Sequence, residues 1–84
     1  MIDRKLLPIE WTEFMYELED AREHLDTLIK NVTQLPDYDE AAFRIDLGHV
    51  YAHLNRAWRR SSKGLDDGDW EAASQFPCDL KPIG

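Results

Sequence analysis

The sequence has little cysteine and little glycine, and it lacks both a basic excess and a long apolar run. Cys78 is the single cysteine among 84 residues, which excludes an internal disulfide and fits a reducing compartment. The four glycines are not clustered, so a glycine-rich loop for nucleotide phosphates is not expected. No stretch approaches the roughly 20 apolar residues of a membrane span, and the N-terminus has no signal-peptide segment. These absences predict a cytoplasmic protein without membrane association.

The charge is acidic and unevenly distributed. The chain carries 17 acidic and 10 basic residues, for a net charge of −7. Residues 1–40 hold eleven acids and four bases, whereas residues 41–84 hold six of each. Nucleic-acid binding needs a basic surface that displaces counterions from phosphates, and anionic membranes attract basic segments in the same way. The charge distribution argues against both kinds of partner.

Apolar residues recur at helical spacing in two segments of similar length. From Trp11 to Val32 they are three or four positions apart, which predicts a helix over 8–33 that begins at Pro8. A second stripe predicts a helix over 38–62, with Asp37 as its N-cap and Glu40 completing a capping box. Because the connection is short, the two helices are expected to form an antiparallel hairpin that turns near residue 35.

The residues after 62 change in character. Asp69 is positioned to cap a short helix over 69–75. Two prolines favour an extended tail over 76–84, and its apolar side chains are expected to dock on the hairpin with Trp70; these are Phe76, Leu80 and Ile83. The sequence therefore predicts one all-α domain over 1–84, a helical hairpin with a short C-terminal helix and a docked extended tail.

The antiparallel pairing predicts a polar seam between the helices. With a turn near residue 35, Glu17 lies level with His53 and His24 lies level with Asp46. Glu10 extends the same seam toward Arg60, and Asp26 lies level with Arg44 near the turn. Exposed pairs of this kind contribute about 0–1 kcal/mol each, so the seam fixes the register of the helices more than their stability.

Two helices cannot enclose a core, because each buries only one stripe against the other. A homodimer that forms a four-helix bundle is the expected solution. Aromatic residues with nearby arginines are typical of interface hot spots. The predicted interface has three aromatic anchors and a polar rim of two arginines: Trp11, Tyr51 and Trp58, with Arg56 and Arg59.

This composition predicts a protein-interaction module, such as an adaptor, regulator or assembly factor, that binds itself or an unidentified protein. No serine–histidine–aspartate arrangement and no strand–turn–helix motif around a nucleophile is present, so no catalytic activity and no cofactor are expected.

A metal-binding bundle is the first alternative. Asp46, His49 and His53 have the spacing Asp-x-x-His-x-x-x-His, and histidines at i and i+4 occur in helical zinc sites. Glu17 or Asp20 from the first helix could complete such a site. Against this alternative, His49 lies about 130° from the apolar stripe at 100° per residue, toward solvent. The polar seam accounts for the same residues without a metal.

An acidic decoy is the second alternative. Residues 10–26 carry seven acids and only Arg22 as a base, so the first helix could imitate nucleic acid and block a basic protein. This interpretation predicts salt-sensitive binding to a basic partner. It loses its basis if the carboxylates are paired with the arginines of the second helix.

Overall fold

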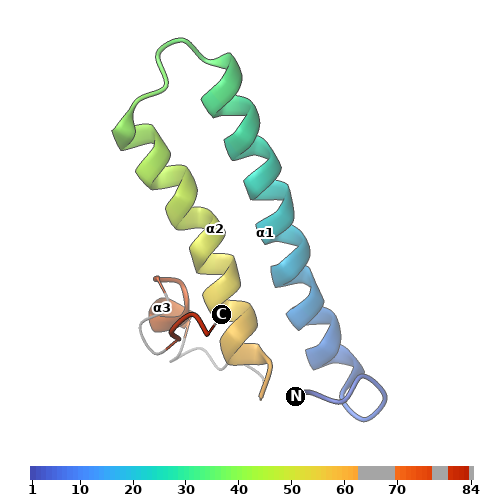
Figure 1. Ribbon diagram of the computed structural model, residues 1–84. Helices are drawn as coiled ribbons and strands as arrows, with labels where there is room; N and C mark the ends of the chain where they lie inside the picture. Colours follow the sequence, from blue (N-terminus) through green and yellow to red (C-terminus); the bar gives the residue numbers. More distant parts are fainter. Residues whose placement is uncertain (63–69, 77–79, 84) are drawn as a thin grey trace.

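The computed structural model describes residues 1–62, 70–76 and 80–83. In this part of the chain there are three helices and no strand: α1 (Pro8–Gln34), α2 (Glu40–Arg60) and α3 (Trp70–Ala73). The helices α1 and α2 lie side by side as an antiparallel hairpin, and the short α3 contacts α2 near its C-terminal end (Figure 1). This arrangement confirms the predicted all-helical hairpin. Among the described residues, no helix is long and apolar enough to cross a membrane.

Helix α1 matches its predicted bounds to within one residue. Pro8 occupies the first turn, where its missing N–H leaves no hydrogen bond unmade. At the other end, the Leu35 N–H donates to the carbonyl of Asn31 at 3.0 Å, and residue 35 already has extended backbone before Pro36.

Helix α2 begins two residues later than predicted. Its N-cap is Asp39, whose carboxylate accepts from the N–H of Ala42 at 2.9 Å, so the predicted Asp37 cap and its capping box are wrong. The reason lies in Tyr38, whose N–H donates to the carbonyl of Leu35 and whose hydroxyl donates to Asp46. Both bonds hold residue 38 in the turn. The helix ends at Arg60 rather than at residue 62, and Gly64, the predicted terminating residue, lies outside the described residues.

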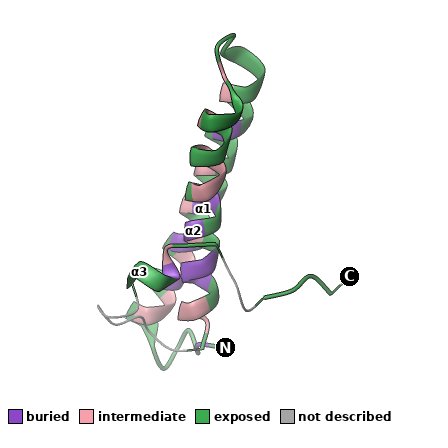
Figure 2. Cartoon of the chain, turned by 90° about the vertical axis from the view of Figure 1, so that its left-hand side faces the viewer, coloured by how far each residue is buried: buried purple, intermediate pink, exposed green. Residues whose placement is uncertain are grey.

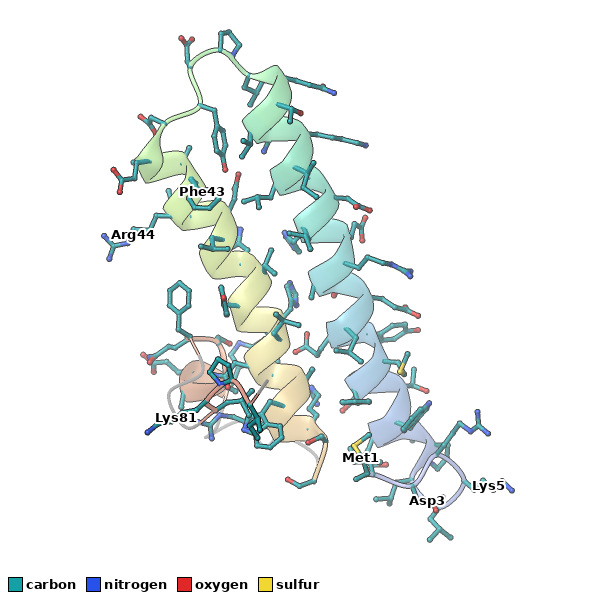
Figure 3. The ribbon with its side chains drawn as sticks, viewed as in Figure 1. Met1, Asp3, Lys5, Phe43, Arg44 and Lys81 are labelled. Carbon is teal, nitrogen blue, oxygen red and sulfur yellow. The ribbon has the colours of Figure 1, made fainter. Side chains whose placement is uncertain are left out.

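The N-terminal segment packs against the hairpin, which the sequence pattern did not indicate. The N–H of Ile2 donates to the carbonyl of Ser61 at 2.7 Å. The side chain of Ile2 is buried against Phe14 and Ala57, the centre of the small apolar core. Figure 3 shows this segment, with Met1 and Asp3, beside the start of α1. The segment therefore joins the start of α1 to the end of α2.

A buried amide of α2 holds the C-terminal end of helix α3. Asn55 is only 1% exposed, and its Nδ2 donates to the carbonyls of Ala72 and Gln75 at 3.2 and 3.0 Å. These bonds satisfy carbonyls at the end of a helix that is shorter than the predicted 69–75. The predicted cap, Asp69, lies outside the described residues.

The tail meets the hairpin at Phe76 and again at Leu80, which lines one hollow with Tyr51 and another with Leu54. The ring of Phe76 lies 5.0 Å from that of Tyr51, centroid to centroid. Ile83 is 96% exposed, so its predicted docking is wrong, because the chain there runs away from the helices (Figure 2). In the same view α3 and the tail lie on opposite sides of the hairpin.

Candidate functional site

The hairpin has two chemically different flanks, one on each side of the line where α1 meets α2. The polar flank comprises Glu17, Asp20, His24, His49, His53 and Arg56. The apolar flank comprises Leu18, Leu25, Ile29, Val32, Phe43, Leu47, Leu54 and Trp58. At 100° per residue, helical spacing separates the two sets by about 115° on α1 and about 145° on α2. The hollows agree with this assignment: one is lined by His24, His53 and Trp70, and another by Leu18, Leu54 and Trp58.

A buried ion pair forms the centre of the polar flank. Glu17 is 6% exposed, and its Oε2 accepts a hydrogen bond from Nε of Arg56. Its Oε1 lies 3.1 Å from Nδ1 of His53, which confirms the predicted pairing of Glu17 with His53. Arg60 Nε is 3.8 Å from the same carboxylate. The acidic side chain of α1 is thus neutralised by its own partner helix.

Arg56 is a buried structural residue rather than an exposed rim residue, contrary to the sequence prediction. It is 7% exposed, its Nη1 donates to Ser74 Oγ at 2.7 Å, and its guanidinium lies 4.5 Å from the ring centroid of Trp70. Together with the bond to Glu17, these contacts connect all three helices. This role could not be predicted from periodicity, because Trp70 and Ser74 follow a segment whose path the helical pattern does not specify.

The register differs from the prediction beyond the central pair. Arg60 Nη1 donates to Glu13 at 2.9 Å, so the predicted Arg60–Glu10 pair is wrong. The predicted pairing of Asp26 with Arg44 is also wrong, since Arg44 points away from α1 (Figure 3). The physical reason is the turn, which centres on residue 37, midway between the end of α1 and the start of α2, instead of residue 35.

The predicted metal ligands are only partly brought together. Glu17, Asp20 and His53 each offer a ligand atom, and these atoms lie within 4.8 Å of one another. Asp46 instead accepts from Tyr38 Oη at 2.7 Å and from Asn31 Nδ2 at 3.2 Å. The polar seam therefore does not pair His24 with Asp46 through a hydrogen bond.

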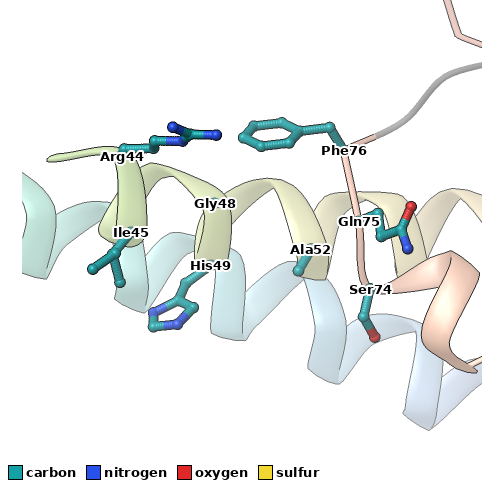
Figure 4. Close-up of a pocket in the computed structure, with 8 residues that line it drawn as sticks. All are labelled: Arg44, Ile45, Gly48, His49, Ala52, Ser74, Gln75 and Phe76. Atoms are coloured by element: carbon teal, nitrogen blue, oxygen red, sulfur yellow. The ribbon is translucent and has the colours of Figure 1, made fainter. Parts of the chain in front are cut away.

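His24 belongs to a histidine cluster that the sequence analysis did not assemble. Its ring is stacked on that of His53 at a centroid distance of 4.8 Å, and it meets the ring of His49 edge-on at 5.6 Å. Figure 4 shows His49 on the opposite edge of α2 from Arg44 and Phe76. The i, i+4 spacing of His49 and His53 is visible in the sequence. The contact of His24 with both of them depends on the register of the two helices.

Tyr38 and Asp46 form an electrostatic pair near the turn. Burial raises the pKa of Tyr38 to about 12, and the hydrogen bond to Asp46 and the charges of Asp46 and Asp39 act in the same direction. The hydrogen bonds from Tyr38 and Asn31 hold the pKa of Asp46 below its usual value of 3.8. The neutral phenol and the ionised carboxylate therefore stabilise each other.

An alkaline titration tests this pair. Because the folded-state pKa of Tyr38 is raised, its hydroxyl contributes stability that is complete below pH 10.0 and is lost as the pH rises toward 12. We expect the tyrosinate absorbance to show a phase near pH 12 that disappears in Tyr38→Phe and remains in Tyr16→Phe. A late phase that survives in Tyr38→Phe would contradict the assignment.

The apolar flank is exposed along its whole length. Ile29 and Val32 are 52% and 50% exposed near the turn, and Trp58 is 43% exposed at the other end. Of the other predicted interface residues, Trp11 packs on Phe14 with ring centroids 5.5 Å apart, Tyr51 lies beside Phe76, and Arg59 is half-buried. The fully buried apolar side chains are few and mostly small, so the hairpin buries little of its own apolar surface.

The total accessible surface area also indicates that the chain buries little of its surface. The chain exposes 6541 Å², whereas a compact monomer of 9.8 kDa is expected to expose about 5,200 Å². The excess is about 1,300 Å². The half-exposed side chains of the apolar flank contribute to this excess.

Comparison with protein-family models, with curated proteins and with solved structures finds no match to this chain.

Proposed function

We propose that this chain is a small cytosolic protein-interaction module without catalytic activity of its own, which acts as a homodimer through the apolar flank. The observation that carries the proposal is the continuity of that flank over both long helices. Contiguous apolar surface of this extent is typical of protein–protein interfaces and is uncommon on monomers. Two hairpins that face each other through these flanks form a four-helix bundle.

The excess of exposed surface favours a second copy of this chain as the partner that covers the apolar flank. A stable interface buries roughly 800 Å² per partner, and the surface excess of about 1,300 Å² per chain is of that size or larger. A two-fold dimer uses the same patch on both chains, so each flank serves as the other's cover. For a single 84-residue chain this cover enlarges the small core around Ile2, Phe14 and Ala57.

The described tail residues meet only one end of the flank, where they also line a hollow with Leu47 and Tyr51. Leu80 lines a hollow with Leu54 and Trp58 at one end of the hairpin. The described tail residues do not reach the turn end of the flank, where Ile29 and Val32 remain half-exposed. A second chain can cover this end as well.

Within the proposed interface, Trp58 and Tyr51 act as aromatic anchors and Arg59 contributes to the polar rim. The ring of Trp11 packs on that of Phe14, which lies beneath the apolar flank. The acidic-decoy alternative has less support, because Glu13 and Glu17 are engaged by Arg60 and Arg56.

The molar mass in solution tests the proposal. Light scattering after size exclusion is expected to give about twice 9.8 kDa for tag-free protein, with the dimer persisting on dilution into the micromolar range. A mass of one chain at every concentration would overturn the homodimer. A dimer that then binds no other protein would limit the module to self-association.

A further inference from the structure

Each long helix contributes two metal-ligating side chains one turn apart on the polar flank. Asp20 and His24 are at i and i+4 on α1, and His49 and His53 are at i and i+4 on α2. All three histidines of the chain line one hollow of about 350 Å³. The ring of His24 on α1 therefore lies close to both histidines of α2, and the carboxylate of Asp20 lies beside His53.

The ring separations agree with shared coordination. A zinc–nitrogen bond of roughly 2.0–2.1 Å places the ring centroid about 3.2 Å from the metal, so two imidazoles at a tetrahedral angle have centroids about 5 Å apart. The observed centroid distances from His24 are 4.8 Å to His53 and 5.6 Å to His49. Rotation of the His24 ring out of its stacked position is the adjustment that coordination requires.

Glu17 is placed to select the His53 tautomer that a metal needs. Its Oε1 lies 3.1 Å from Nδ1 of His53, so a proton on Nδ1 is donated to the carboxylate and Nε2 keeps its lone pair. A carboxylate behind a ligating histidine is the usual arrangement in metal sites. Arg56 Nη2 lies 2.9 Å from the same Nδ1, and since a guanidinium only donates, this contact competes with the Glu17 bond. A metal on Nε2 selects the Glu17 arrangement.

The local charge permits a divalent cation despite the nearby arginine. The guanidinium of Arg56 is bonded to Glu17 and Ser74 and lies over Trp70, so its charge is already compensated. Asp20 makes no such ion pair among the described contacts, and its carboxylate lies within 4.8 Å of the His53 ligand atom. It supplies the negative charge that three neutral imidazoles lack.

We propose that Asp20, His24, His49 and His53 form a binding site for a divalent transition metal of the Zn²⁺ class, with Glu17 as the residue that positions His53. Three imidazoles and one carboxylate suit Zn²⁺ in tetrahedral geometry, whereas Mg²⁺ and Ca²⁺ favour oxygen ligands. The site would join α1 to α2 within one chain. It lies on the flank opposite the proposed dimer interface, so the two proposals stand or fall separately.

Calorimetric titration of tag-free full-length protein with ZnCl₂ tests the site. A Cys78→Ser background removes the single thiol, so that measured affinity belongs to the histidines. We expect one Zn²⁺ per chain, and Co²⁺ is expected to give the visible absorption of tetrahedral coordination. His49→Ala is expected to weaken binding by more than the roughly 10–100-fold that loss of a partner behind a ligand costs, without unfolding, because His49 is exposed.

Two further variants separate a built site from adventitious binding. Asp20→Asn is expected to weaken Zn²⁺ binding and to remove the Co²⁺ spectrum, whereas Glu23→Gln, an exposed acid on the same helix, is expected to change neither. Absence of saturable Zn²⁺ binding would overturn the proposal. So would an affinity that His49→Ala and Asp20→Asn leave unchanged.

Discussion

Glu17→Gln is expected to destabilise the protein by about 3–5 kcal/mol, the cost of breaking a buried ion pair from one side. The substitution keeps the size of the side chain but removes the charge that compensates Arg56, whose side chain is 9% exposed. It also replaces one of the two accepting oxygens by an NH2 donor, so the side chain can no longer accept from both Arg56 Nε and His53 Nδ1. For a domain of this length, total stabilities of roughly 4–13 kcal/mol are typical, so this single change removes a large share.

Urea unfolding of Glu17→Gln and of the parent protein, at one protein concentration, measures this difference. The matched control is Glu13→Gln, which breaks the pair with Arg60 on the same helix. Glu13 is 49% exposed, so its loss is expected to cost about 0–1 kcal/mol. In Glu17→Leu/Arg56→Leu both charges are absent, and much of the lost stability is expected to return. Equal effects at Glu17 and Glu13 would contradict the buried pair.

Leu54→Glu is expected to convert the proposed dimer into a monomer. Leu54 is 39% exposed on the apolar flank, next to Trp58 and Leu18. In a four-helix bundle this position becomes buried, and a buried unpaired carboxylate is strongly unfavourable. Light scattering is expected to give a mass near the 9.8 kDa of one chain. Circular dichroism is expected to show that the helices remain.

Ile45→Glu is the matched control for this change. Ile45 is an exposed apolar residue of α2, like Leu54, but it lies outside the apolar flank and lines the hollow with Gly48 and His49. Its substitution is expected to leave the mass unchanged. If Leu54→Glu loses its helices, Leu25→Glu on α1 provides the second test. A dimer that survives both flank substitutions would place the interface elsewhere.

The helical pattern predicted the hairpin well because periodicity and proline positions are local signals. Pro8 and Pro36 bounded α1 correctly. The start of α2 was less well specified, since Asp37 and Asp39 are both competent caps. The choice between them depends on Tyr38, whose hydroxyl donates to Asp46, a residue inside α2. A contact of this kind is decided by tertiary structure.

The polar flank was predicted only where the register allowed it. The Glu17–His53 pair was expected and is present, but Arg60 pairs with Glu13 because the turn centres two residues later than assumed. The burial of Arg56 and Asn55 depends on α3, whose docking leaves no periodic trace in the sequence. His24 joins His49 and His53 for the same reason of register.

Isotope-filtered nuclear Overhauser spectroscopy on a mixture of labelled and unlabelled chains tests the central claim most directly. If the apolar flank is the dimer interface, contacts between chains are expected among the methyl groups of Leu18, Leu25, Ile29 and Leu54. The same spectrum is expected to show no contacts between chains from Ile45. Intermolecular contacts confined to Ile45 and its neighbours, or none at all in a protein of dimeric mass, would contradict the account.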